Sequence, residues 1–203
     1  MKVNWAERLI VNNPIRALIQ ERIIIRWIKT KVELRSGREF LEIGCGRGAG
    51  ASLLLKEFLP AAVHAMDLDL QMIIQARKYL VTAQRQKIHL YVGDVLQVPH
   101  RSASVDAVFG FGVLHHLPDW RGGVAEIARV LRPGGIYFLE EFYPPVYLNF
   151  VSRRLFVHPE EDRFTSRDLR QGLAAAGLPI KDALEIKQIG ILAVCRKTAT
   201  NPR

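Results

Sequence analysis

The sequence predicts an α/β fold in which helices cover both faces of a doubly wound, mostly parallel sheet. From residue 38 onward, short runs of strand-forming apolar residues alternate with stretches of helical periodicity. Such alternation implies parallel strands joined by right-handed helical crossovers. The last two apolar runs, 182–187 and 190–196, are separated by too few residues for a helix. The final strand is therefore expected to return antiparallel, as one arm of a hairpin.

The individual elements follow from the same periodicities, taken in chain order. Strands are predicted at residues 39–43, 62–66, 88–92, 105–111, 135–140, 182–187 and 190–196. Helices are predicted between them at residues 49–58, 70–83, 122–131 and 166–176.

A further helix is predicted within residues 1–37, where Asn13 and Pro14 are suited to its start. Its apolar stripe is widened by Ile24, Ile25 and Ile28 and is flanked by arginines. One interpretation is a helix that lies on a membrane surface or covers a greasy substrate. The other is a helix packed on the main domain with a solvated basic face.

The domain organisation follows from length and composition. A chain of 203 residues with 49% hydrophobic residues is the size of one globular domain with a small appendage. We divide it into a helical segment, residues 1–37, and a main domain, residues 38–197. Within the main domain, residues 141–164 are rich in aromatic residues with arginines between them. They are expected either to form a substrate-side insertion or to fill the core as a helical hairpin.

Charge and cysteine content indicate which partners and compartment to expect. Lys and Arg outnumber Asp and Glu by 29 to 20, so an anionic partner such as nucleic acid or an acidic membrane surface is considered. The two cysteines, Cys45 and Cys195, form neither a disulfide framework nor a metal-ligand set, and no metal is expected. With no apolar run of about 20 residues, the expected location is the cytoplasm, with peripheral membrane contact through residues 1–37 as an option.

Three alternate glycines form the most informative local pattern. Gly44, Gly46 and Gly48 follow an apolar strand and precede a helix. Glycine allows a tight turn there and lets a ligand lie against the backbone, while the start of a helix favours an anionic group. The pattern predicts a small anionic or zwitterionic cofactor, although a simple tight connection would look similar.

Two carboxylates follow at the ends of the next two strands. Asp67 lies about 20 residues beyond the glycine turn, where a carboxylate is suited to accept hydrogen bonds from both hydroxyls of a ribose. Asp94 is placed to accept a hydrogen bond from an adenine amino group, or to serve as an ordinary turn residue. Asp69 is a candidate helix cap.

Taken together, these motifs resemble a known family. The segments 41–48, 66–67, 93–95, 104–108, 114–117 and 131–135 occur in the order and at about the spacings of class I S-adenosylmethionine-dependent methyltransferases. The resemblance is greatest to the group that contains ubiquinone and menaquinone biosynthesis enzymes, and it covers residues 38–140. It implies a Rossmann-like seven-stranded sheet with an antiparallel last strand. It also implies an enzyme that uses S-adenosyl-L-methionine and releases S-adenosyl-L-homocysteine.

The resemblance also implies roles for particular residues. Carried over by position, the residues of the cofactor site are Glu42, Gly44, Cys45 and Gly46 beside the methionine portion and the adenosine, Asp67 at the ribose, Leu68 and Met72 beside the adenine, Asp94 and Val95 at its edge, and Phe111 on the methyl-facing side. The segment 109–112 is more aromatic and glycine-rich than is usual in the family.

Catalysis by such an enzyme mainly requires alignment of the acceptor and exclusion of water. If the acceptor must lose a proton, His115 or His116 is the candidate general base, because both follow the fourth strand. Glu140 and Glu141, at the end of the fifth strand, are further candidates. Alternatively, the two histidines pack at the start of a helix. The two glutamates would be ordinary, partly exposed residues at a strand end.

The predicted function is methyl transfer to a small, lipophilic molecule or a lipid headgroup. The isoleucine stripe and the aromatic segment suggest two apolar covers over the strand ends. An RNA or protein methyltransferase using the basic surface and an NAD(P)-dependent oxidoreductase are the alternatives, together with a binding module without catalysis. Against methylation of a nucleic-acid base, residues 110–113 lack the Asn/Asp-Pro-Pro-aromatic motif.

Overall fold

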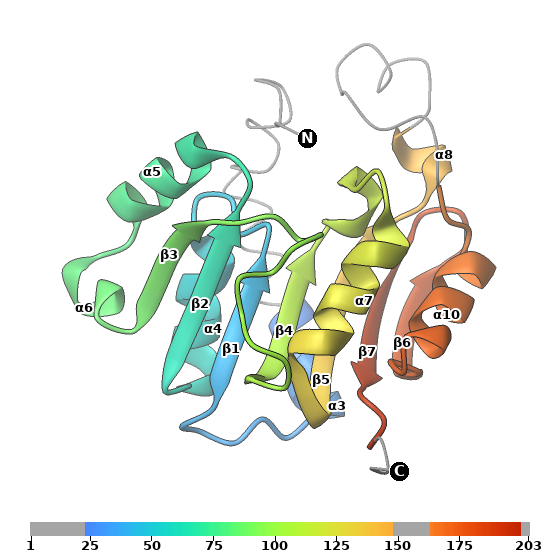
Figure 1. Ribbon diagram of the computed structural model, residues 1–203, viewed down its shortest axis with the longest axis horizontal. Coiled ribbons are helices and arrows are strands. Elements are labelled where there is room, and N and C mark those ends of the chain that lie inside the picture. Colours follow the sequence, from blue (N-terminus) through green and yellow to red (C-terminus); the bar gives the residue numbers. More distant parts are fainter. Residues whose placement is uncertain (1–22, 148–162, 200–203) are drawn as a thin grey trace.

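The computed structural model describes residues 23–147 and 163–199, and these form a seven-stranded sheet with helices on both faces (Figure 1). The strand order is β3-β2-β1-β4-β5-β7-β6. Strands β1 to β5 pair in parallel, whereas β7 runs antiparallel to both of its neighbours, β5 and β6. The predicted fold, including the antiparallel last strand, is confirmed.

The strands are β1 (Glu39–Ile43), β2 (Ala62–Asp67), β3 (Ile88–Val92), β4 (Val105–Phe111), β5 (Leu131–Phe142), β6 (Ile180–Ile186) and β7 (Gly190–Arg196). The helices are α3 (Ile25–Lys31), α4 (Ala49–Phe58), α5 (Leu70–Tyr79), α6 (Thr82–Arg85), α7 (Trp120–Val130), α8 (Pro144–Tyr147) and α10 (Ser166–Ala175), with a 3₁₀ turn, η2 (Leu114–His116).

Two elements differ from their predicted bounds by more than two residues. The helix predicted at 70–83 is interrupted at Leu80, which is extended and fully buried, so the chain turns inward before α6 begins. Strand β5 starts directly after α7 rather than at Gly135, and its register against β4 shifts between Val105 and Ala107. Gly134, with φ of 76°, lies in this irregular stretch, where a left-handed conformation favours glycine.

The core consists of two apolar layers, one on each side of the sheet. Because successive strand residues point to opposite faces, Phe40 packs towards α4 whereas Leu41 packs towards α7. Figure 1 shows α7 in front of the sheet and α3 and α4 behind it. The layer behind the sheet contains a group of neighbouring aromatic rings, Phe40, Phe58, Phe109, Phe111 and Phe138.

The burial of the isoleucines in and just before α3 shows whether they face a membrane or the domain. Ile24, Ile25 and Ile28 are buried in the layer behind the sheet, so the interpretation of these three as a membrane-facing stripe is wrong, because their side chains are packed inside the domain. Residues 1–22 lie outside the described part, and membrane contact through them stays a prediction. Within the described ranges, no helix is long and apolar enough to cross a membrane.

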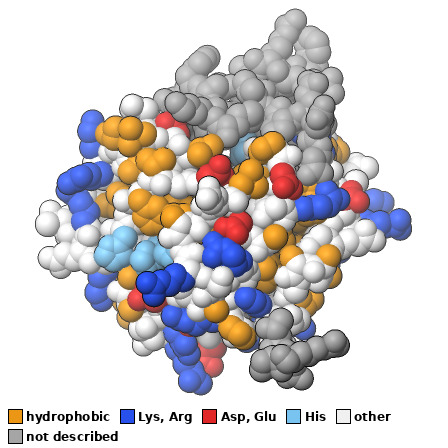
Figure 2. Space-filling model, viewed as in Figure 1, with side chains coloured by type: hydrophobic (Ala, Val, Ile, Leu, Met, Phe, Trp, Pro, Cys, Tyr) orange, Lys and Arg blue, Asp and Glu red, His pale blue; other side chains and the backbone are white. Residues whose placement is uncertain are grey.

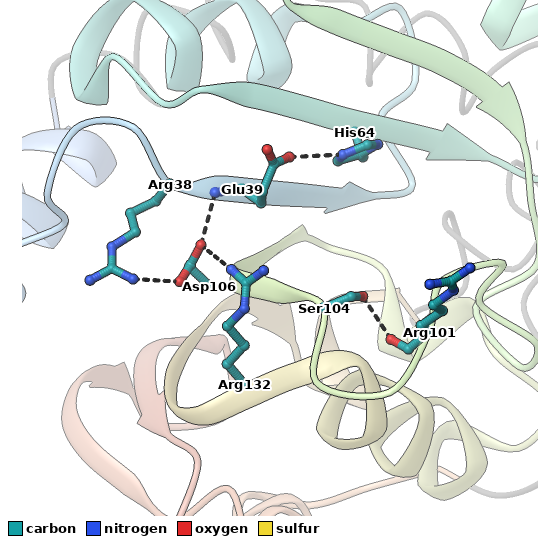
Figure 3. Close-up of polar contacts among 7 residues, drawn as sticks. All are labelled: Arg38, Glu39, His64, Arg101, Ser104, Asp106 and Arg132. Carbon is teal, nitrogen blue, oxygen red and sulfur yellow. Dashed lines mark hydrogen bonds and ion pairs between the residues drawn. The ribbon is translucent and has the colours of Figure 1, made fainter.

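A carboxylate ties three strands together at their amino ends. Asp106, at the start of β4, accepts a hydrogen bond from the Glu39 backbone N–H at 2.9 Å (Figure 3). It also forms ion pairs with Arg38, at 2.9 Å, and with Arg132. Partial burial alone would raise the pKa of Asp106, but these hydrogen bonds and charges hold it below its usual value. This Asp106 cluster lies at the end of the sheet opposite to the carboxyl ends of the parallel strands.

Candidate functional site

A cavity lies at the carboxyl ends of the parallel strands, the edge where doubly wound folds bind ligands. It is lined by Gly44, Gly46, Asp67, Leu68, Met72, Gly93, Asp94, Val95, Phe111, Gly112, Val113, His115, His116, Leu117 and Phe142. The lining residues lie at or after the carboxyl ends of β1 to β5. Because the strand order is β3-β2-β1-β4-β5, the residues at β1, β2 and β3 form one end of the cavity, and those at and after β4 and at β5 form the other.

The glycine turn requires its glycines for backbone geometry. Gly44, Gly46 and Gly48 have φ values of 62°, 51° and 81°, all in the left-handed region. A Cβ atom on Gly44 would lie 2.8 Å from Cγ2 of Val113, closer than the side chain beside it allows. The turn therefore keeps bare backbone at the cavity wall, which is the geometry expected where a ligand lies against the main chain.

Asp67 connects this turn to the end of β2. One carboxylate oxygen accepts a hydrogen bond from the Gly46 N–H and the other from the Asp69 N–H, each at 2.9 Å. Burial raises the pKa of Asp67, while these two hydrogen bonds act in the opposite direction. Asp69 itself caps α5 by accepting from the Gln71 N–H, as anticipated. A fixed carboxylate thus faces the cavity beside the glycine turn.

At the third strand end, the structure shows the turn role that was considered for Asp94, and contact with an adenine stays a prediction. Asp94 is exposed and lines the cavity, and its side chain also accepts a turn-type hydrogen bond from the Leu96 N–H at 2.9 Å. The loop that follows is held by α7, because Glu126 accepts from the Val98 N–H and Arg129 donates to the Val98 carbonyl, both at 2.9 Å. The loop that follows Asp94 is therefore held by contacts outside the cavity.

Two of the expected cofactor residues lie behind the turn rather than on the cavity wall. Glu42 is 2% exposed, and a Cβ on Gly50 would lie 2.0 Å from one of its oxygens, so α4 covers it closely. Burial, followed by the negative charge of Asp67, raises the pKa of Glu42 to about 8, although the Ala51 N–H lowers it. The other oxygen of Glu42, Oε2, is buried without a hydrogen-bond partner. Cys45 is also buried, and burial raises the pKa of its thiol well above the ordinary value.

Glu141 is directed at the turn η2 and not at the cavity. Its Oε1 accepts hydrogen bonds from the backbone N–H groups of Val113, at 2.9 Å, and Leu114, at 2.7 Å. Its Oε2 lies 2.7 Å from Nδ1 of His115. The Glu141 side chain is fully buried, so it holds the start of η2 and one imidazole in place from behind.

Of the four candidate bases, the two histidines line the cavity and the two glutamates do not. His115 and His116 line the cavity, with their ring centroids 4.2 Å apart. Glu140 and Glu141 do not line it, and Glu141 binds backbone groups instead. As neighbours in a strand, the two glutamates point to opposite faces of the sheet.

Five lining residues were not among the predicted cofactor or catalytic residues. These are Gly93, Gly112, Val113, Leu117 and Phe142. The four residues other than Phe142 lie within or beside the segments that carry the family motifs. Their proximity to those motifs is the sequence feature that could have identified them as lining residues. Phe142 is the first aromatic residue of the 141–164 segment, of which residues 148–162 lie outside the described part. No group of three or more metal-binding side chains occurs among the described residues.

Comparison with known proteins gives a family for the central part of the chain. Residues 41–139 match the family model described as a methyltransferase domain. A Mycolicibacterium smegmatis protein named as a probable S-adenosylmethionine-dependent methyltransferase is 32% identical over 74% of this chain and 56% of its own length. A fatty-acid O-methyltransferase of the same organism is 37% identical over 55% of this chain and 39% of its own length. The chain thus spans about half, or less, of the length of these curated relatives.

Solved structures agree on the fold. The crystal structure of an S-adenosylmethionine-dependent methyltransferase from Aquifex aeolicus superposes with a TM-score of 0.74, covering 97% of this chain and all of that one. The sequence identity of this pair is 16%, so the likeness supports the architecture alone.

Proposed function

We propose that this chain transfers a methyl group from S-adenosylmethionine to a small, lipophilic molecule or a lipid headgroup, because residues 41–139 match the methyltransferase-domain family model and a relative is named as a probable S-adenosylmethionine-dependent methyltransferase. The cavity supports this proposal by joining two chemically different ends. One end carries the glycine turn and carboxylates, and the other carries apolar and imidazole side chains. The narrower likeness to the ubiquinone and menaquinone group stays a prediction.

The first end suits the family's cofactor, S-adenosylmethionine. When bound, this cofactor supplies a methyl group activated by a sulfonium. Asp67 and Asp94 offer carboxylates for ribose hydroxyls and an adenine amino group, and bare backbone at Gly44 and Gly46 leaves room beside them. Glu42 does not line the cavity, and its place beside the methionine portion stays a prediction. We propose Leu68, Met72 and Val95 as the apolar walls for the adenine.

The second end supports a lipophilic acceptor. Phe111, Val113, Leu117 and Phe142 give it mostly apolar walls. Among the described residues that line the cavity there is no Lys or Arg, which favours a small molecule over a phosphodiester backbone. Figure 2 shows Lys and Arg side chains spread over the visible face rather than gathered in one stripe. The fatty-acid methyltransferase among the relatives is consistent with a lipophilic substrate.

Cofactor binding is the first test. Titration calorimetry is expected to show micromolar affinity for S-adenosylhomocysteine and no binding of NAD. Asp67→Asn should weaken that affinity by about 10- to 100-fold, because one charged hydrogen-bond acceptor is lost. Asp182→Asn, a matched change at an exposed ion pair with Lys31, should leave it unchanged. Equal affinities for all three proteins would contradict the placement of the ribose at Asp67.

The acceptor is then sought with labelled cofactor. Incubation with fractionated lipid and metabolite extracts is expected to label an organic-soluble product. Label found only in RNA or protein fractions would instead support the alternative that uses the basic surface.

A further inference from the structure

The contact between Glu141 and His115 fixes which ring nitrogen can act on a substrate. Nδ1 of His115 lies 2.7 Å from a buried carboxylate that also accepts two short backbone hydrogen bonds. A carboxylate only accepts hydrogen bonds, so Nδ1 must carry the proton. In the neutral ring, Nε2 is then the basic nitrogen.

His115 is neither a fully enclosed core residue nor an exposed surface histidine. The His115 side chain is 7% exposed yet lines the cavity, and its ring contacts those of His116 and Phe142. The Glu141 charge behind it stabilises the imidazolium that forms when Nε2 takes up a proton. The site thus holds a base that is oriented before the substrate arrives.

We infer that the acceptor is an acidic hydroxyl compound, namely a phenol or an enol on an apolar skeleton; this inference rests on the proposed function. His115 is the general base that takes the hydroxyl proton, and Glu141 is the residue that positions His115. In the transfer step, the O–H bond of the acceptor breaks and its proton moves to Nε2 of His115. The oxygen forms a bond to the methyl carbon. The bond between that carbon and the sulfonium sulfur breaks, and its electron pair stays on sulfur. Charge and atoms balance, and no further reactant is required.

The same geometry disfavours a carboxylate acceptor. A carboxylic acid is already ionised near neutral pH and has no proton for His115 to remove. Its negative charge would also approach the buried charge of Glu141, which lies directly behind the imidazole. A phenol approaches as a neutral molecule, and the apolar side chains of Val113, Leu117 and Phe142 suit its skeleton.

The test uses acceptors that differ in their need for a base. Wild type, His115→Gln and Glu141→Gln are assayed with labelled S-adenosylmethionine and three probes: para-nonylphenol, its ortho-nitro derivative, which is ionised at the assay pH, and oleate. Both variants should lose about 100-fold or more in kcat on nonylphenol. The nitro derivative is an anion that the Glu141 charge repels, so its turnover by the wild type should be lower than that of nonylphenol. Because its proton is already gone, the variants should lose less than about 5-fold on it relative to the wild type. Oleate should not be methylated.

Glu141→Gln separates tautomer control from loss of structure. Its side-chain carbonyl can still accept from Val113 and Leu114, but its amide donates towards Nδ1 and moves the His115 proton to Nε2. Nitrogen NMR of labelled histidine should show this exchange of protonated nitrogens. His89→Gln and Glu33→Gln, two exposed positions that do not line the cavity, are the controls and should match wild type.

Each other outcome has a distinct meaning. Equal loss on both phenols would make His115 a merely structural residue and overturn the inference. Methylation of oleate in preference to the phenols would overturn the acceptor class but leave the proposed function intact. Absence of methylation for all three probes, with S-adenosylhomocysteine still bound, would also contradict the acceptor class. Absence of cofactor binding would instead contradict the proposed function itself.

Discussion

Glu42 shows how one buried carboxyl can link pH to stability. Its pKa is raised to about 8 by burial, whereas in the unfolded chain it titrates near 4.5. The folded state therefore binds an extra proton between these values, and its stabilising effect is lost as pH rises towards 8. Glu42→Gln mimics the protonated form, so its melting temperature relative to wild type should rise between pH 5 and pH 8.5. Glu33→Gln, at an exposed position, is the control. A constant difference for Glu42→Gln would show that Glu42 is ionised throughout this range.

At the same scale, the sequence predicts which residues surround the site better than it predicts their directions. Asp67 and Asp94 could be placed because parallel strands end at one edge and the spacing identifies their last residues. Glu140 and Glu141 could not be distinguished, since a shift of one residue exchanges the two faces of a strand. The contact of Glu141 with η2 depends on how β5 and the turn pack in three dimensions, which no local pattern encodes.

At the scale of elements, helix α3 is part of the core. Ile28 is fully buried beside the sheet, whereas Ile23, just before the same helix, is 55% exposed. Ile28→Ala should lower the free energy of unfolding by about 2–5 kcal/mol, because it removes three buried carbons and leaves a cavity. Ile23→Ala is the matched control and should change it by less than about 0.5 kcal/mol. Urea denaturation measures both, and equal effects would place α3 outside the cooperative core.

The elements that matched their predicted bounds are those with strong local signals. Helix α4 begins after Gly48 and ends before Leu59, which are both left-handed, and its predicted bounds were correct. The helix at 70–83 lacked such a stop signal. Its break arises because the buried Leu80 side chain draws the chain inward, and that burial is a tertiary effect.

At the scale of the whole molecule, the proposed binding site and the Asp106 cluster lie at opposite ends of the sheet. The cavity lies at the carboxyl ends of the strands, and the Asp106 cluster joins the starts of β1, β4 and β5. Such a division is expected in doubly wound folds, where strand order and crossovers fix the ligand edge. Residues 41–139 contain Asp106, Arg132 and most of the cavity lining, whereas Arg38 and Glu39 of the cluster and Phe142 of the cavity lie just outside the matched region.

Asp106→Asn should therefore change stability without changing cofactor affinity. It removes a charge that accepts one backbone hydrogen bond and pairs with Arg38 and Arg132, so about 2 kcal/mol of unfolding free energy should be lost at neutral pH. Because the pKa of Asp106 is lowered in the folded state, this stabilisation is present above its ordinary value and is lost as pH falls through the folded value. The difference in melting temperature between wild type and Asp106→Asn should thus shrink below about pH 4. The affinity of Asp106→Asn for S-adenosylhomocysteine, measured by calorimetry at neutral pH, should stay within about twofold of the wild-type value, whereas Asp67→Asn should weaken it. A loss of affinity in Asp106→Asn would show that the two ends of the sheet are energetically coupled.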